Sequence, residues 1–236
     1  MPALIRHGMT ATRLSRLELT VLALVAMLIV LGFIFVYTDL PRFESYIQED
    51  GLIEWLTVAG LLAASAVSLY RAIALFRYKT GRFIFTNAVL GILLCIAAGE
   101  EISWGQRTLG IQTPEYFKEH NLQAETNLHN LKINGIEVNR FVFSDLLIGV
   151  LVIYLAIFPL LYRKWEPMKS FINGWGIPLP QLYQILAFLL VFITTALIPN
   201  GKRAELLECG AALLFFLIIY YPAQPALFRR MQKITD

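Results

Sequence analysis

Acidic residues that stand in or beside long apolar stretches are the part of this sequence best suited to chemistry. Glu100 and Glu101 are adjacent and follow an apolar run long enough for a membrane helix. Carboxylates in hydrocarbon are costly and normally have a partner or a function. The other acids near the same end of their apolar stretches are Glu54, Asp145, Glu205 and Glu208. Acids from several helices at one depth predict a site near one membrane surface.

A histidine in the segment after the glutamate pair extends this set. Asn121, Glu125 and His129 are spaced four residues apart, so they would share one face of a helix. An imidazole held by a carboxylate, or a carboxylate in an apolar setting, can act as a general base. The catalytic candidates are therefore Glu100, Glu101 and His129.

The same kinds of side chain also suit a divalent metal ion. Carboxylate oxygens together with one imidazole favour zinc, manganese, calcium or magnesium over copper. Such an ion would activate water for hydrolysis. The candidate metal ligands are Glu101, Glu125, His129 and Glu208.

Polar and aromatic residues around these groups are the candidates for substrate binding. Trp104 would lie one turn beyond the glutamate pair if the helix continued, at the interfacial depth where tryptophan is common. Arg107 would bind an anionic headgroup or compensate the charge of the pair. Asn127 and Asn130 would fix the tautomer of His129 or contact a polar headgroup.

Some of the acids also have a structural explanation. Glu54 and Glu205 could stand in the first turn of a helix, where the macrodipole favours acids. Glu205 could also pair with one of the two basic residues just before it, and Asp145 with Arg140. The adjacent pair has no such explanation, because the dipole disfavours acids at a helix C-terminus. The residues taken as supporting the site are Glu54, Asp145 and Glu205.

The elements that must position these residues are transmembrane helices. Hydrophobic residues make up 57% of the chain and charged residues 16%, against about 45–50% and about 25% in soluble domains, and the mean hydropathy is +0.61. A span needs roughly 20 mainly apolar residues. Six stretches qualify, at about 18–37, 52–75, 83–103, 141–162, 180–198 and 204–221. We predict an all-α membrane protein, with residues 1–236 forming one polytopic domain of six transmembrane helices.

The distribution of basic residues predicts the orientation of these helices. Most of the 20 Lys and Arg residues are in four segments. These are the N-terminal segment, the connection between spans two and three, the connection between spans four and five, and the segment after span six. The positive-inside rule then places both termini in the cytoplasm. The first apolar run is too long for a signal-peptide core, so we expect it to be retained. The expected location is a bacterial inner membrane with membrane lipids as partners. The chain has no basic folded module for nucleic acid.

The longest connection, residues 104–140, lies on the outer side in this orientation. The TPE triplet at 113–115 predicts a helix start, with threonine as N-cap and proline in the first helical position. This helix would run to about Leu131, and the LKINGIEV segment at 131–138 predicts a small hairpin with an Asn-Gly turn. Long ordered loops tend to be functional. The loop is also the candidate surface for a membrane-protein partner.

Two resemblances follow from this region. The GEEISWGQR segment at 99–107, followed by ETNLHN at 125–130, resembles a pattern of uncharacterised polytopic bacterial membrane proteins. Adjacent glutamates followed by arginine also resemble glutamate intramembrane proteases of the CAAX-processing type, in which glutamate and histidines activate water. That resemblance implies Glu100, Glu101 and His129 as matching positions. Arg107 lies six residues after the pair where that family has four, and no later span supplies a second histidine.

These patterns favour a membrane enzyme, a hydrolase or transferase that acts on a lipid or lipid-linked substrate at the outer leaflet. An ion-coupled transporter would instead need acids near the bilayer midplane and helices broken there. A non-catalytic assembly or accessory subunit would use the outer loop and its glutamates to bind another protein. The position of the acids near the outer interface is the reason for preferring the enzyme.

Overall fold

The apolar stretches predicted to span a membrane are helical in the computed structural model, which describes residues 14–133, 135–138 and 146–230. Within these residues, four helices are long and apolar enough to cross a membrane: α1 (Arg16–Thr38), α3 (Leu52–Ala74), α4 (Gly81–Glu101) and a helical segment over Leu147–Lys164. The fifth and sixth predicted spans form the shorter helices α10 (Leu182–Ala196) and α11 (Ala204–Tyr220). The all-α membrane architecture is therefore confirmed.

Local side-chain bonds determine where several of these helices begin. The Ser15 hydroxyl accepts a hydrogen bond from the Glu18 backbone N–H at 3.2 Å, and the Glu18 carboxylate accepts one from the Ser15 N–H at 2.7 Å. This reciprocal pair satisfies two N–H groups that a helix start leaves open. The Thr80 hydroxyl likewise accepts from the Phe83 N–H at the start of α4.

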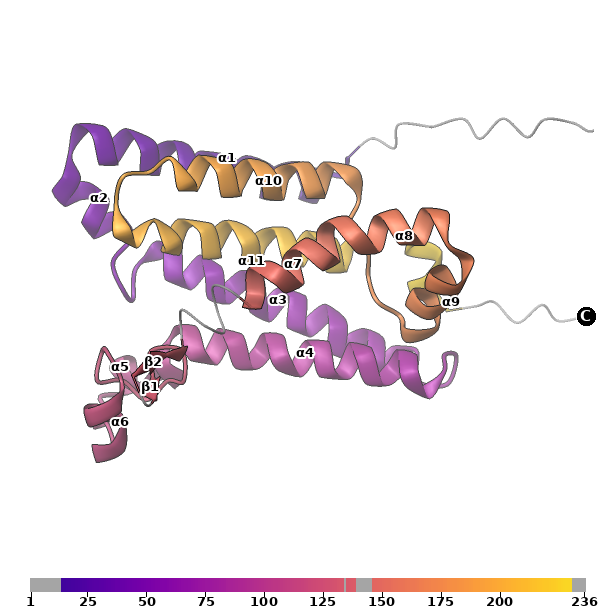
Figure 1. Ribbon diagram of the computed structural model, residues 1–236, viewed down its shortest axis with the longest axis horizontal. Helices are drawn as coiled ribbons and strands as arrows, with labels where there is room; N and C mark the ends of the chain where they lie inside the picture. Colours follow the sequence, from indigo (N-terminus) through magenta and orange to yellow (C-terminus); the bar gives the residue numbers. More distant parts are fainter. Residues whose placement is uncertain (1–13, 134, 139–145, 231–236) are drawn as a thin grey trace, which may run out of the picture.

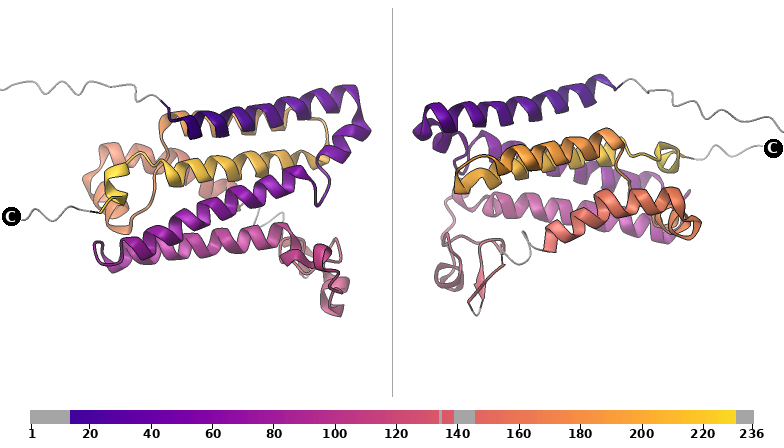
Figure 2. Two further views of the ribbon diagram at one scale, coloured as in Figure 1. Left: turned by 180° about the vertical axis from the view of Figure 1, so that it is seen from behind. Right: turned by 45° about the horizontal axis from the view of Figure 1, so that its top comes forward.

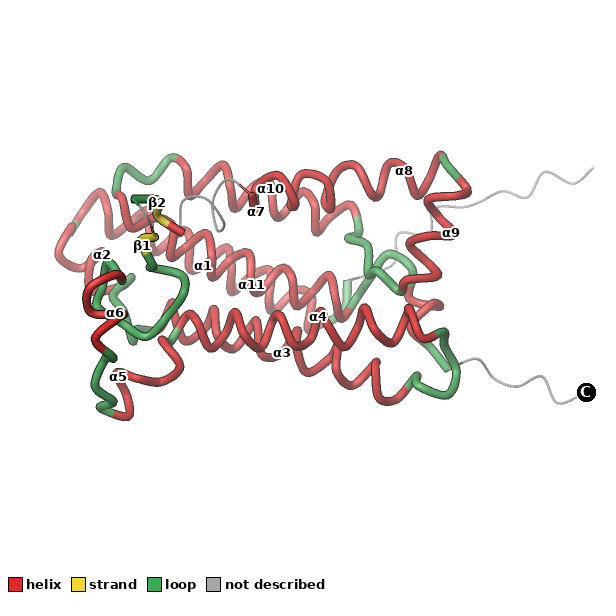
Figure 3. The backbone as a smooth tube through the Cα atoms, turned by 60° about the horizontal axis from the view of Figure 1, so that its bottom comes forward, coloured by secondary structure: helices red, strands yellow, loops and turns green. Residues whose placement is uncertain are grey.

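The helices lie alongside one another, with α11 in the middle of the bundle (Figures 1 and 3). α11 packs against α1, α3 and α10, and α3 also packs against α4. Residues of α11 on every side are buried, including Leu206, Cys209, Leu214, Leu217 and Ile218. α1 begins and α11 ends at the same end of the bundle (Figure 1). Short 3₁₀ turns, η4 (Gly201–Arg203) and η5 (Pro225–Phe228), precede and follow α11.

The segment Leu147–Lys164 is helical throughout but irregular. It consists of α7 (Leu147–Val152), a π-helical turn η3 (Ile153–Ile157) and α8 (Phe158–Lys164). Pro159 lacks the N–H that an α-helix would use and crowds the preceding turn, which accounts for the π turn just before it. No side chain of these elements is buried. The amphipathic helix α9 (Glu166–Trp175) follows and was not predicted.

The long connection after α4 folds into a small body beyond the end of that helix (Figure 2). Its side chains contact Glu49, Asp50 and Glu54, in the connection between helix α2 (Leu40–Tyr46) and α3 and in the first turn of α3. It contains η1 (Ser103–Gly105), α5 (Gln106–Leu109) and α6 (Glu115–His120). Strands β1 (Lys132–Ile133) and β2 (Ile136–Glu137) pair antiparallel, with Ile133 opposite Ile136, so the predicted hairpin is confirmed.

The predicted helix from 113 to about 131 is wrong in its extent. α6 ends at His120, and its N-cap is Pro114, which offers no side-chain bond. The Thr113 hydroxyl does not cap the helix but donates to the Ala124 carbonyl at 2.7 Å. Ala124 itself has a positive φ of 54°, which a right-handed helix does not allow.

Close packing of α3 on α11 provides a test of the bundle. A Cβ on Gly60 would lie 3.1 Å from two backbone atoms of α11, whereas Gly149 in α7 has open space around it. We expect Gly60→Val to destabilise the protein by about 1–3 kcal/mol, because backbone cannot move aside as a flexible side chain does. The same change at Gly149 is the control. Thermal unfolding in detergent measures both, and equal midpoints would contradict this packing.

Candidate functional site

The glutamate pair lies where α4 ends and the chain reverses direction. Ser103, Trp104 and Gly105 have positive φ values of 46°, 56° and 74°, so the helix cannot continue past the pair. The Trp104 indole N–H donates to Glu100 Oε1 at 2.8 Å, and its ring covers Gly99, where an added Cβ would lie 2.8 Å away. The predicted position of Trp104, one helical turn beyond the pair, is therefore wrong.

Glu100 joins α4 to the outer loop. Its Oε2 accepts hydrogen bonds from the backbone N–H groups of Leu128 at 2.6 Å and His129 at 3.1 Å. With Trp104 this carboxylate has three donors while being only 8% exposed. Charge-assisted bonds of this kind are among the stronger ones in proteins. The structure thus brings the predicted residues Glu100 and His129 together, through the backbone of the histidine.

Arg107 on α5 is the centre of an ion-pair network. Its Nη1 donates to both oxygens of Glu125 at 2.8 Å, its Nη2 to Glu54 Oε1 at 2.5 Å and its Nε to Asp50 Oδ2 at 2.9 Å. Glu49 lies 4.0 Å away. These carboxylates come from the start of α3, from the connection just before it and from the outer loop. One guanidinium therefore ties three segments of the chain together.

The partners of Arg107 settle two of the predicted alternatives. Burial lowers the pKa of the Arg107 guanidinium, but its bonds to Asp50 and Glu125 and the charge of Glu54 outweigh this and raise the pKa above the usual value. Arg107 does not bond to the adjacent glutamate pair, so the idea that it compensates their charge is wrong. Glu54 lies in the first turn of α3, as the structural alternative predicted, and accepts the Asp50 N–H at 2.5 Å, but it also pairs with Arg107.

Amide side chains shape the loop around this network. Asn121 Oδ1 accepts the backbone N–H groups of Gln123 and Glu125, and its Nδ2 donates to Asn127 at 2.9 Å. Such bonds compete with helix formation, which explains why α6 stops just before Asn121. Asn127 Nδ2 donates to the Ser103 hydroxyl, which in turn donates to Glu125. The predicted helical face of Asn121, Glu125 and His129 is wrong, although Asn121 and Glu125 are both buried in the loop.

A second acidic group lies beside this network and is of a different kind. Glu101 interacts electrostatically with Glu205 and Glu54, and Glu208 interacts with Glu101 and Glu205. All three of Glu101, Glu205 and Glu208 are partly buried. No hydrogen bond joins their carboxyl groups to another residue in the described part of the chain, although the charge of Lys202 acts on Glu205. We call Glu101, Glu205 and Glu208 the carboxyl cluster.

The predicted metal ligands are divided between these two regions. Glu125 is bonded to Arg107, whereas Glu101 and Glu208 belong to the carboxyl cluster. Within residues 14–133, 135–138 and 146–230, no three or more His, Cys, Asp or Glu side chains are grouped closely enough to hold a metal ion. Asp145 and its suggested partner Arg140 lie outside the described residues.

The predicted substrate-binding residues take part in the loop network. Asn130 donates to Gln123 at 2.5 Å, and its N–H donates to Asn127. The sequence reasoning did not identify Asp50 or Gln106, whose Oε1 accepts the Thr126 N–H at 2.6 Å. The only available signal was their polarity next to an apolar run.

Comparison of the chain with protein-family models, curated proteins and solved structures finds no match.

Removing the guanidinium should open the outer loop. Arg107→Met leaves Glu54 and Glu125 buried without their cation, which typically costs about 3–5 kcal/mol. We expect faster hydrogen exchange and proteolysis over residues 106–131 in detergent. Lys118→Met is the control, because its pair with Glu115 is exposed and such pairs contribute about 0–1 kcal/mol. Unchanged protection in Arg107→Met would contradict the role of this network.

His129 should make the loop sensitive to acid. Burial lowers the pKa of its imidazole below 6.5, and the Glu100 carboxylate offsets this only in part. The unfolded chain therefore binds a proton at a higher pH than the folded chain does. As the pH decreases from about 6.5, the free energy of unfolding decreases, until the pH is below the folded pKa. NMR titration should give a His129 midpoint below 6.5.

The same effect should be visible in stability measurements. His129→Gln should reduce the loss of folding stability between about pH 7.5 and about pH 5.5, a range that includes the ordinary pKa of histidine. A His129 midpoint above 6.5 would show that the charge of Glu100 outweighs burial.

Proposed function

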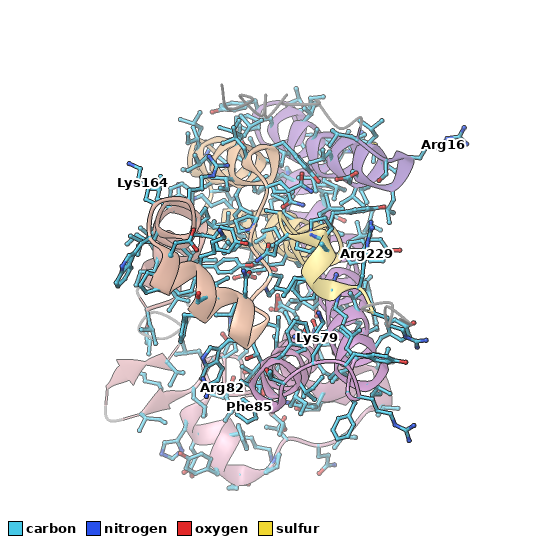
Figure 4. All side chains as sticks on the ribbon, turned by 90° about the vertical axis from the view of Figure 1, so that its right-hand side faces the viewer. Arg16, Lys79, Arg82, Phe85, Lys164 and Arg229 are labelled. Carbon is cyan, nitrogen blue, oxygen red and sulfur yellow. The ribbon has the colours of Figure 1, made fainter. Side chains whose placement is uncertain are left out.

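We propose that the chain is a six-span protein of a bacterial inner membrane with both ends in the cytoplasm. α10 and α11 lie alongside the longer helices of the bundle (Figure 3). Arg16, Lys79, Arg82, Lys164 and Arg229 are all at one end of the molecule (Figure 4). The carboxylates around Arg107 and the carboxyl cluster are at the other end. This charge separation supports the orientation under the positive-inside rule.

The chemistry that we propose for the outer end is hydrolysis of, or group transfer to or from, a lipid or lipid-linked substrate. The observation that carries this proposal is the difference between the two neighbouring glutamates. Glu100 is bonded to three donors, whereas the carboxyl group of Glu101 has no hydrogen-bond donor in the described part of the chain and interacts with Glu205 and Glu54. Glu101 is thus available to a reacting group, and Glu100 is not.

Glu101 is the general base in this proposal. Its carboxylate would take a proton from water or from a substrate hydroxyl as that oxygen attacks the substrate. Glu205 and Glu208 would share the proton taken up by Glu101, which then passes to the leaving oxygen as the bond between that oxygen and the substrate breaks. The imidazole of His129, whose backbone N–H binds Glu100, would be a second proton acceptor. A metal-assisted form of the same reaction would need a divalent ion held by fewer than three of these side chains, with water as the remaining ligands, because no three of them are grouped closely enough in the described part of the chain.

Lipid analysis of a strain that lacks this protein tests the proposal. The substrate should accumulate in that strain and disappear when the wild-type chain is restored. Glu101→Gln should fail to remove it, since loss of a general base typically lowers the rate by about a hundredfold or more. Glu115→Gln is the matched control, because Glu115 is exposed and, among the described residues, forms an ion pair with Lys118 only. Each variant is first checked for normal membrane accumulation and thermal unfolding.

Two outcomes would decide against the enzyme. A wild-type lipid profile with Glu101→Gln would remove the catalytic role of the carboxyl cluster. A metal content that is unchanged by Glu101→Gln and His129→Ala would remove the metal-assisted form.

An accessory role is the second candidate. It is favoured by exposed apolar side chains on the outer loop, among them Leu109 at 70%, Ile111 at 56% and Leu128 at 54% exposed. The loop elements project beyond the end of α4, where another membrane protein could contact them (Figure 2). In the lipid experiment this role predicts that Glu101→Gln restores the wild-type lipid profile in full. It also predicts that one partner protein co-purifies with both the wild type and the Glu101→Gln variant.

A further inference from the structure

A cavity of about 720 Å³ lies at the basic end of the molecule, far from the carboxyl cluster. The last turns of α3, the start of α4 and the segment that follows η5 form its walls. The residues that matter here are Arg77, Tyr78 and Arg230 on its polar side and Ile73, Phe76 and Ile84 on its apolar side. Two guanidinium groups and an apolar surface therefore share one cavity.

The two arginines have no carboxylate partner among the residues that the structure describes. The ion pairs of Arg and Lys in that part of the chain involve Arg107, Lys118 and Lys169 only. Two acids at the same end of the molecule are bonded to other residues. Glu18 accepts bonds from Ser15 and Tyr183, and Glu166 pairs with Lys169. The cavity thus presents positive charge that an external anion would neutralise.

The fold holds Arg230 at this cavity through aromatic contacts. The Arg71 guanidinium lies 4.2 Å from the centre of the Phe228 ring, and Phe228 also packs against Phe83 of α4. Phe228 is thus fixed between α3 and α4, two residues before Arg230. The Arg230 guanidinium then lies 5.8 Å from the Tyr78 ring. Contacts of cations with aromatic faces are favourable at such distances.

The apolar side of the cavity determines the class of ligand. Ile73 is 78% and Phe76 69% exposed, and they lie at the end of α3 next to other exposed apolar side chains of that helix, such as Tyr70. A soluble anion would gain nothing from these side chains, whereas an acyl chain would cover them. Arginine binds phosphate oxygens through paired N–H donors. Tyrosine at this level is typical of the membrane interface.

We propose that this cavity binds an anionic phospholipid, with the phosphate between Arg77 and Arg230 and an acyl chain along Ile73 and Phe76. The inference does not depend on the chemistry proposed for the opposite end of the molecule. It assigns the basic end a defined lipid site in addition to a general attraction to anionic headgroups.

Native mass spectrometry of the full chain in detergent, titrated with phosphatidylglycerol or phosphatidylcholine, tests this proposal. The wild type should retain phosphatidylglycerol at a lower lipid concentration than phosphatidylcholine. Replacing both Arg77 and Arg230 by Gln should weaken this retention roughly tenfold to thirtyfold, from the typical contribution of a basic residue to binding anionic lipid. Both arginines are exposed, so the variant should fold, which its thermal midpoint verifies.

Matched variants distinguish a specific lipid site from a general attraction of anionic lipid to the basic end of the molecule. Arg163→Gln with Lys164→Gln removes two charges of α8 at the same end and should leave the retention unchanged. Equal weakening by that pair would overturn the proposal, as would equal retention of the two lipids by the wild type. Inorganic phosphate at the lipid concentration should not displace the lipid. Displacement would show a phosphate site without an acyl component and would also overturn the proposal. Phe76→Ser should weaken retention without changing the preference for the anionic lipid.

Discussion

The Arg107 guanidinium is bonded to carboxylates from three separate parts of the chain, and the outer end of the molecule is built around it. Glu54 and Glu125 are buried, and a buried carboxylate without a counterion costs several kcal/mol. The loop must therefore fold so that Glu125 reaches the same cation as Glu54. Ser103, Asn121 and Asn127 then satisfy the remaining donors and acceptors of this arrangement.

This requirement divides the acidic residues into two groups with different roles. Acids bonded to Arg107, or to the backbone N–H groups as Glu100 is, maintain the structure and are not free for another partner. Glu101, Glu205 and Glu208 face one another from α4 and α11 without such bonds. A group of carboxyls next to hydrocarbon favours proton uptake or a cationic ligand. The candidate chemistry therefore belongs to the second group only.

The two ends of the bundle carry opposite charge. One end has a cavity and the other has a folded loop. Basic and aromatic side chains surround a cavity at one end, where Arg71 holds Phe228 in place. Carboxylates and a folded loop occupy the other. A helical bundle in a membrane allows this separation because its middle is apolar and carries few charges. A lipid site at one end and a reaction at the other can thus exist independently.

Composition and apolar periodicity determined the helices, because a membrane span needs a long apolar stretch and little else. The Asn-Gly hairpin and the acidic character of one end were also readable, since both are local properties of the sequence. The sequence did not show which acid binds which partner. The left-handed turn at Ser103 to Gly105 redirects Trp104 and Arg107, and Asn121 stops α6 by bonding to the backbone. Only tertiary structure decided these pairings, because they join residues that are far apart in the chain.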